Sequence, residues 1–157
     1  MMSARHTVAG IDHSRDVESM NDIVVGIDRS ETAARAAAVG AEMASALGVN
    51  LHLVTCADKS SSTDLTVGSD RFHTDWLADA ELFLNDAARQ LAYDQVTCTV
   101  RSGNPATVLC DEARRLDARM IVVGNRRVQG VSRVLGSVGR DVLKHADCDV
   151  LIVDTTS

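Results

Sequence analysis

Residues 124 to 138, GNRRVQGVSRVLGSV, combine glycines and arginines in a pattern that suits anion binding. Gly124, Gly130 and Gly136 allow the backbone to turn tightly, and N–H groups in such a turn can surround a phosphate. Gly136 and Ser137 open a segment with a helical pattern, and the start of a helix presents unpaired N–H groups and a positive dipole end. The stretch therefore predicts either a phosphate-binding loop or a flexible joint.

The local charge is also unusual, because the whole chain carries a net charge of −6. Residues 125 to 144 contain one acid, Asp141, and five cations: Arg126, Arg127, Arg133, Arg140 and Lys144. A bound anion would explain this excess, and so would a solvated helix face, which is the commoner cause. The acidic balance of the chain disfavours general nucleic-acid binding.

Other chemistries find no support in the sequence. No Walker-type loop occurs, and no G-x-G-x-x-G follows the first predicted strand, so a P-loop enzyme or a dinucleotide fold is not expected. Cys56, Cys98, Cys110 and Cys148 are far apart and include no C-x-x-C pair, and the histidines show no ligand spacing. No nucleophile has a recognisable base in a motif. We expect a binding protein rather than an enzyme, without catalytic residues or a structural metal.

The elements that must position the loop alternate along the chain. Short apolar runs predict strands at 22–27, 50–56, 95–101, 119–124 and 148–154. Helical patterns lie between them at 31–47, about 73–92, from 105 onward and about 137–146, and a polar loop is expected at 58–70. This order predicts an α/β fold, a three-layer α/β/α sandwich around a five-stranded parallel sheet. Ligands bind such sheets beyond the carboxyl ends of the strands, where Asp28 and Gly124 fall.

Some of these polar residues can also be explained as helix caps, which is a simpler role than ligand binding. Asp28 followed by Glu31 resembles a capping pair, and Ser137 is a candidate cap of the last helix. Asn104-Pro105 is typical of a helix start, and Gly48 of a helix end. Asp28 and Ser137 can therefore be caps, ligand-binding residues or both.

The chain of 157 residues suits a single domain, predicted at 21–157. VAGIDHS (8–14) nearly repeats VVGIDRS (24–30), but only the second copy is followed by a full helix, so residues 1–20 are interpreted as a mobile arm. These twenty residues lack the apolar core of a secretory signal, and no run approaches the ~18 apolar residues of a membrane span. We expect a cytoplasmic location without membrane contact.

Three segments, in the same order, resemble the universal stress protein family. VVGIDRSETAARA is similar to the family's first strand and turn, and RSGNPATVLCDEA to the segment that enters its third helix. VVGNRRVQGVSRVLGSVGRDVLKHADCDVLIV is similar to its nucleotide loop, last helix and last strand. The resemblance covers about residues 21 to 154 and implies a Rossmann-like, adenine-nucleotide-binding fold.

The ATP-binding branch of that family carries G-x-x-G, nine residues and then G-[ST]. The resemblance implies that Asp28 meets the adenosine moiety, that Val54 and Val123 touch adenine, and that the glycine loop holds ribose and phosphates. The implied ligand is ATP, or AMP or cyclic AMP, and Mg²⁺ can accompany ATP. The corresponding binding residues here are Asp28, Val54, Val123, Gly124, Arg127, Gly136, Ser137 and Val138.

The loop departs from the pattern at its second glycine. Arg127 stands there, and only eight residues separate it from Gly136. Arg127 can contact a phosphate or block it, which leaves three functions open. The first is an adenine-nucleotide-binding stress or signalling protein, the second is a nucleotide-free interaction module, and the third is a slow ATPase or autophosphorylating protein. In the first two, the resemblance implies a homodimer formed through the last strand, 148–154.

Overall fold

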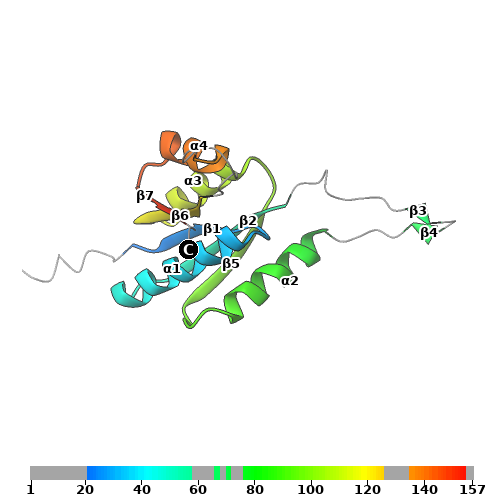
Figure 1. The fold of residues 1–157 in the computed structure, drawn as a ribbon, viewed down its shortest axis with the longest axis horizontal. Coiled ribbons are helices and arrows are strands. Elements are labelled where there is room, and N and C mark those ends of the chain that lie inside the picture. The colour runs from blue at the N-terminus through cyan, green and yellow to red at the C-terminus, as the bar shows by residue number, and fades with distance from the viewer. Residues whose placement is uncertain (1–20, 58–65, 68–69, 72–75, 126–134, 155–157) are drawn as a thin grey trace, which may run out of the picture.

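The computed structural model describes residues 21–57, 66–67, 70–71, 76–125 and 135–154. Its centre is a parallel sheet of five strands in the order β5-β2-β1-β6-β7 (Figure 1). The strands are β1 (Ile23–Gly26), β2 (Leu51–Cys56), β5 (Val96–Arg101), β6 (Met120–Gly124) and β7 (Asp149–Val153). The predicted arm, residues 1–20, and Arg127 lie outside the described residues.

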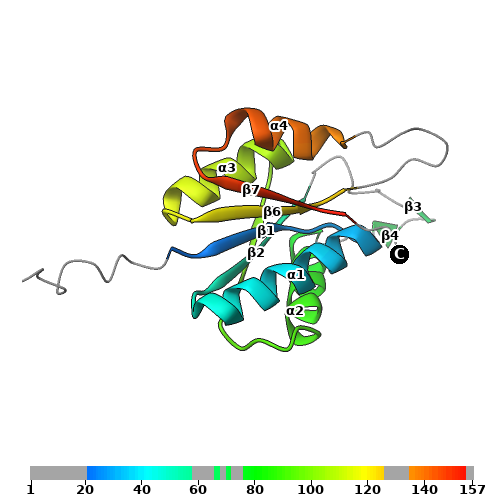
Figure 2. The same ribbon diagram turned by 60° about the vertical axis from the view of Figure 1, so that its left-hand side comes forward.

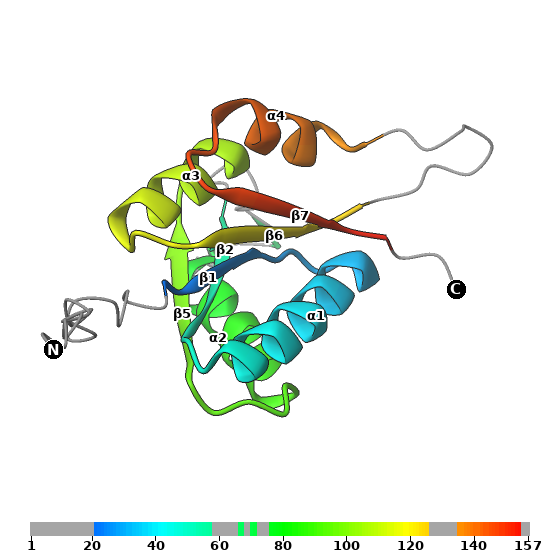
Figure 3. The same ribbon diagram turned by 90° about the vertical axis from the view of Figure 1, so that its left-hand side faces the viewer.

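Two helices cover each face of the sheet. α1 (Glu31–Leu47) and α2 (Trp76–Arg89) lie on one face, and α3 (Pro105–Arg115) and α4 (Ser137–His145) lie on the other (Figures 2 and 3). The predicted three-layer α/β/α sandwich with a five-stranded parallel sheet is therefore confirmed. The predicted strands and helices agree with these bounds to within a few residues.

The side chains of β1 show how the two halves of the core arise. Val25 packs with the α1 and α2 side, whereas Val24 packs with the α3 and α4 side, as the alternation of a strand requires. Both are fully buried. α1 approaches the sheet closely, because a Cβ at Gly40 would lie 2.6 Å from Cγ2 of Val25. The alanine-rich composition of this helix thus allows tight contact with the strand that leads to the site.

The strand order reverses beside β1. From β1 the chain moves outward to β2 and β5 on one side, and it then crosses to β6 and β7 on the other side. The connections that follow β1 and β6 consequently turn to opposite faces of the sheet, and a crevice opens between the carboxyl ends of the two strands. This topology places the turn after β1 opposite the start of α4.

Helix ends agree with the predictions at two positions and differ at two. Gly48 ends α1 with a φ of 68°, and Asn104 caps α3 by accepting N–H bonds from the first turn. The capping role predicted for Asp28 is wrong, because the cap of α1 is Ser30, whose hydroxyl accepts the N–H of Ala33. The capping role predicted for Ser137 is also wrong, since the helix begins at Ser137 and Gly136 occupies the cap position.

The polar segment predicted as a loop at 58–70 contains regular structure at its end. β3 (Thr66–Val67) and β4 (Asp70–Arg71) form a short antiparallel pair. Two residues per strand are too few for an alternating pattern to be recognised, so the loop prediction missed this pair.

Candidate functional site

A cavity of about 260 Å³ occupies the crevice at the carboxyl ends of β1, β2 and β6. Its walls come from the turn after β1 with the start of α1, the end of β2, the start of α3, the end of β6, and the start of α4. Seven predicted site residues line this one cavity: Asp28, Val54, Val123, Gly124, Gly136, Ser137 and Val138. Arg127, the eighth, lies outside the described residues. The structure brings the seven together, and their contact with a ligand stays a prediction.

Asp28 begins the α1 wall of the cavity. Its Oδ1 accepts the backbone N–H of Ser30 at 2.8 Å and also the Ser30 hydroxyl. Ser30 Oγ lies 2.9 Å from Thr32 Oγ1, and both residues line the cavity. Asp28 Oδ2 has no hydrogen-bond partner among the described residues. One oxygen of Asp28 thus shapes the turn while the other stays available.

The α4 wall provides backbone donors. The first α4 bond runs from Arg140 N–H to the carbonyl of Gly136 at 3.1 Å, and Gly136 has no capping side chain. The N–H groups of Ser137, Val138 and Gly139 precede this bond and have no acceptor within the described part of the chain. They lie at the positive end of the helix dipole, which favours an anionic group.

Gly124 and Gly136, at the two ends of the loop, differ in whether the surrounding structure leaves room for a side chain. A Cβ at Gly124 would lie 2.5 Å from the backbone oxygen of Thr32, so the contact between β6 and α1 excludes any side chain. A Cβ at Gly136 would meet nothing within 4 Å, and its φ of −58° is accessible to every residue. Gly124 is therefore required by the fold, whereas the described structure places no such demand on Gly136.

The remaining lining of the cavity is mostly apolar. Val54, Val123, Pro105 and Leu109 contribute to it and suit a flat apolar group such as a base. Burial raises the pKa of the Cys56 thiol to about 11, so this lining cysteine is neutral at pH 7. Asp28 is the one charged side chain among the lining residues that the structure describes.

Several lining residues were absent from the sequence-based set. Ser30 and Thr32 follow Asp28 at intervals of two, and this D-x-S-x-T spacing was the available signal. Pro105 and Leu109 come from α3, where the sequence indicated only a capped amphipathic helix. Their part in the cavity follows from the packing of α3 over β1 and β2, which a local pattern does not reveal.

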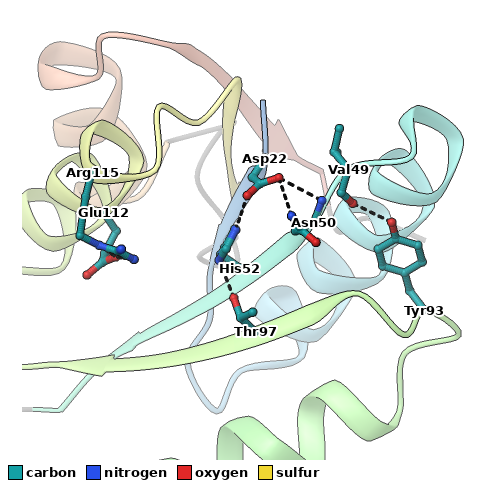
Figure 4. A network of polar contacts seen from close by, with 8 residues as sticks. All are labelled: Asp22, Val49, Asn50, His52, Tyr93, Thr97, Glu112 and Arg115. Carbon is teal, nitrogen blue, oxygen red and sulfur yellow. Dashed lines mark hydrogen bonds and ion pairs between the residues drawn. The ribbon is translucent and has the colours of Figure 1, made fainter. Parts of the chain in front are cut away.

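A second polar cluster lies at the opposite, amino end of the sheet (Figure 4). His52 Nε2 lies 2.7 Å from Asp22 Oδ2, and His52 Nδ1 lies 2.5 Å from Thr97 Oγ1. Asp22 Oδ1 accepts both the backbone N–H of Asn50 at 3.1 Å and its side-chain amide at 3.0 Å. Burial raises the pKa of Asp22, but the hydrogen bonds with His52 and Asn50 outweigh it and hold the pKa below its ordinary value. Both carboxylate oxygens of Asp22 and both ring nitrogens of His52 have protein partners, so the cluster connects the amino ends of β1, β2 and β5.

Among the described residues, no group of three or more histidine, cysteine or acidic side chains is arranged to hold a metal ion. None of the described helices is both long enough and apolar enough to cross a bilayer.

Several known proteins that resemble this chain belong to one family. A family model described as the universal stress protein family matches residues 20–154. A universal stress protein of Synechocystis is 37% identical over 78 residues, which cover 48% of this chain and 51% of that protein. A second one from Synechocystis is 43% identical over 54 residues, covering 34% of this chain and 50% of that protein. The chain spans about half the length of these curated relatives.

Solved structures agree over a larger part of the chain. A universal stress protein in complex with cAMP is 27% identical, with a TM-score of 0.66, and the match covers 87% of this chain and 98% of that one. A universal stress protein from Archaeoglobus fulgidus in complex with dAMP is 28% identical, with a TM-score of 0.59, and the match covers 84% of this chain and 96% of that one.

Proposed function

The chain belongs to the universal stress protein family, and we propose that it binds an adenine nucleotide in the crevice between β1 and β6. Binding would serve as a signal in stress physiology, with ATP as the first candidate ligand and AMP and cyclic AMP as the others. The observation that carries the proposal is one cavity at the strand-order reversal that gathers seven of the eight predicted residues. Structurally similar proteins that bind cAMP and dAMP support the choice of adenine.

The two walls of the cavity suggest how the nucleotide is oriented. The donors at the start of α4 suit the phosphates, since backbone N–H groups at a helix N-terminus favour an anion. Asp28 suits the sugar, because a carboxylate accepts hydroxyl protons and repels phosphate. The apolar lining around Val54 suits the base. Arg127 is proposed to approach the phosphates from the loop between β6 and α4.

The test begins with protein purified from cells. Chromatography of the supernatant after denaturation should reveal adenine nucleotide, and calorimetric titration of nucleotide-free protein should give heat with ATP, AMP or cyclic AMP. Asp28→Ala should lower the affinity by about tenfold, which corresponds to one hydrogen bond to a charged group. Asp94→Ala is the matched control, because Asp94 is exposed and lies outside the cavity. No bound nucleotide and no heat with any of the three ligands would contradict the proposal.

The departure at Arg127 motivates the two alternatives. If the protein is a nucleotide-free interaction module, Arg127→Gly should create binding that the wild type lacks. If it hydrolyses ATP or phosphorylates itself, phosphate release should depend on Mg²⁺ and disappear in Ser137→Ala. Release no greater than in a protein-free sample would remove the last alternative.

We also propose that the protein forms a homodimer through β7, the edge strand beside β6. Asp149 N–H and Val153 C=O bond toward the β6 side, so the polar groups of Val150 and Ile152 point to the open edge. The side chains of Val150, Leu151 and Ile152 are only half-buried. An unpaired apolar edge strand readily pairs with another strand, and a second copy of β7 would satisfy it.

Light scattering of Val150→Pro tests this interface. Proline removes an N–H that points away from β6, so the fold should persist while edge pairing is lost. Val150→Ala also shortens the side chain but keeps the N–H, and it should remain a dimer. A wild-type protein that is monomeric at micromolar concentration, or a dimeric Val150→Pro protein, would contradict the proposed interface.

A further inference from the structure

The polar cluster at the amino end of the sheet contains a hydrogen-bonded chain of three side chains whose proton direction can be deduced (Figure 4). The pKa of Asp22 lies below its ordinary value, so its carboxylate is an acceptor at neutral pH and His52 Nε2 carries the proton between them. In the neutral ring, His52 Nδ1 then has a lone pair, and it accepts the hydroxyl of Thr97 at 2.5 Å. The protons run from Thr97 to His52 to Asp22.

This chain has the arrangement of a nucleophile with a general base. A histidine that accepts a hydroxyl proton, while a carboxylate orients its other ring nitrogen, raises the reactivity of the hydroxyl oxygen. His52 is 8% exposed and is held between two strands, whereas Thr97 is exposed. A reagent in solution can therefore reach the Thr97 hydroxyl while the base behind it stays fixed.

The backbone of β5 places a further donor beside Thr97. β5 is an edge strand, and the N–H of Leu51 in β2 bonds to the carbonyl of Gln95, so the odd-numbered residues of β5 face β2. The N–H of Cys98 consequently points to the open edge, one residue after Thr97. A backbone donor in this place can stabilise the oxyanion that forms when a hydroxyl attacks an acyl carbon.

We propose that Thr97 is a site of covalent acylation, at which its Oγ attacks the carbonyl carbon of a small acyl phosphate. His52 Nδ1 takes the hydroxyl proton as the new ester bond forms, and the bond between the acyl carbon and the phosphate oxygen breaks. The proton then passes from His52 to the released phosphate, so the products are acylated Thr97 and inorganic phosphate. Asp22 is a positioning residue, because it acts through His52. The inference does not depend on nucleotide binding.

Incubation of nucleotide-free protein with acetyl phosphate, followed by peptide mass spectrometry, tests this proposal. Thr99 is the internal control, because it lies on the same face of β5 but its register partner on β2 is Val54, whereas that of Thr97 is His52. Acetylation should be about a hundredfold faster at Thr97 than at Thr99, which is the lower end of general-base catalysis. Thr97→Ser should keep the modification at this position.

Two variants separate the base from its orienting carboxylate. His52→Gln keeps an amide N–H that can bond to Asp22 but cannot act as a base, so acetylation of Thr97 should fall to the rate of Thr99. Asp22→Asn should slow acetylation of Thr97 and leave that of Thr99 unchanged, a selective effect that a general loss of stability does not produce. Thermal unfolding verifies that each variant is folded, and Asp22→Asn alone supplies the comparison if His52→Gln does not fold.

The outcomes that would overturn the inference are distinct. Equal rates at Thr97 and Thr99 in the wild type, or no acetylation of either, would show that His52 does not activate the hydroxyl. A His52→Gln protein that keeps the wild-type rate at Thr97 would show the same. A phosphoryl group in place of an acetyl group on Thr97 would contradict attack at the carbonyl carbon.

Discussion

Asp22 and Asp28 flank the same strand, β1, yet they lie in opposite kinds of surroundings. At the amino end, Asp22 shares both carboxylate oxygens between His52 and Asn50, and both ring nitrogens of His52 are engaged. At the carboxyl end, Asp28 lines the cavity and uses one oxygen within its own turn, and its other oxygen has no partner among the described residues. A polar group whose bonds are all made within the chain stabilises the fold, whereas one with unused capacity can bind a ligand.

The comparison predicts that mutations at the amino end change stability and mutations at the carboxyl end change affinity. The largest effect is expected for His52→Ala, because it leaves a cavity and removes the partner of both Asp22 and Thr97. The free energy of unfolding should fall by about 3 kcal/mol in denaturant titrations. Nucleotide affinity of the folded variant should not change.

His145→Ala is a suitable control for that experiment. His145 is an exposed histidine in the last turn of α4, and its replacement should cost less than about 1 kcal/mol. An equal loss of stability in the two histidine variants would contradict the special role of the amino-end cluster.

Gly124 is an exception to this comparison, because it lies at the carboxyl end and its replacement should nevertheless change stability. Gly124 lines the cavity at the carboxyl end, but its environment is set by the protein itself, since a Cβ would press on the backbone of Thr32. Gly124→Ala should therefore reduce the free energy of unfolding by about 2 kcal/mol, as measured by denaturant titration. If this variant kept wild-type stability, the tight contact between β6 and α1 would not be a constraint of the fold.

Gly136→Ala should behave in the opposite way. A Cβ at Gly136 would meet nothing within 4 Å, so stability should fall by no more than about 1 kcal/mol, the typical cost of alanine at a cap position. A phosphate seated on the start of α4 would meet that methyl group, and affinity should fall by about tenfold in calorimetry. Unchanged affinity would place the phosphates away from this helix.

The smallest expected effect is on the stability of the protein at acidic pH. The pKa of Asp22 is lower in the folded protein than in the unfolded chain, so its contribution is present above roughly pH 4 and is lost as pH falls through the folded pKa. Asp22→Asn should therefore be less stable at neutral pH and should lose less stability between about pH 5 and pH 3. Parallel pH profiles of the two proteins in thermal unfolding would contradict this assignment.

The sequence predicted the fold better than the details of the site, for physical reasons. The sheet and its helices follow from apolar runs such as Met120–Gly124, in which the pattern and the buried environment coincide. The capping role of Asp28 was wrong because Asp28 and Ser30 both suit a helix start, and only backbone geometry selects Ser30. The pairing of His52 with Asp22 crosses two strands, so no local spacing indicates it.

The same limit applies to the hydrogen bonds in the turn after β1. The spacing of Ser30 and Thr32 after Asp28 is visible in the sequence, but only the folded turn shows that the Ser30 hydroxyl contacts both Asp28 and Thr32. A sequence pattern identifies which residues are polar. The structure is needed to show which of their polar atoms already have hydrogen-bond partners and which do not.

The order of the strands also determines when the cavity is completed during synthesis of the chain. The α1 side of the cavity is made early during synthesis and the α4 side near the end, so the complete cavity exists only after β6 and α4 have docked. A ligand that contacts both walls binds only the completed protein and raises its stability by mass action. Under the proposed function, bound nucleotide would therefore protect the finished protein from unfolding and proteolysis.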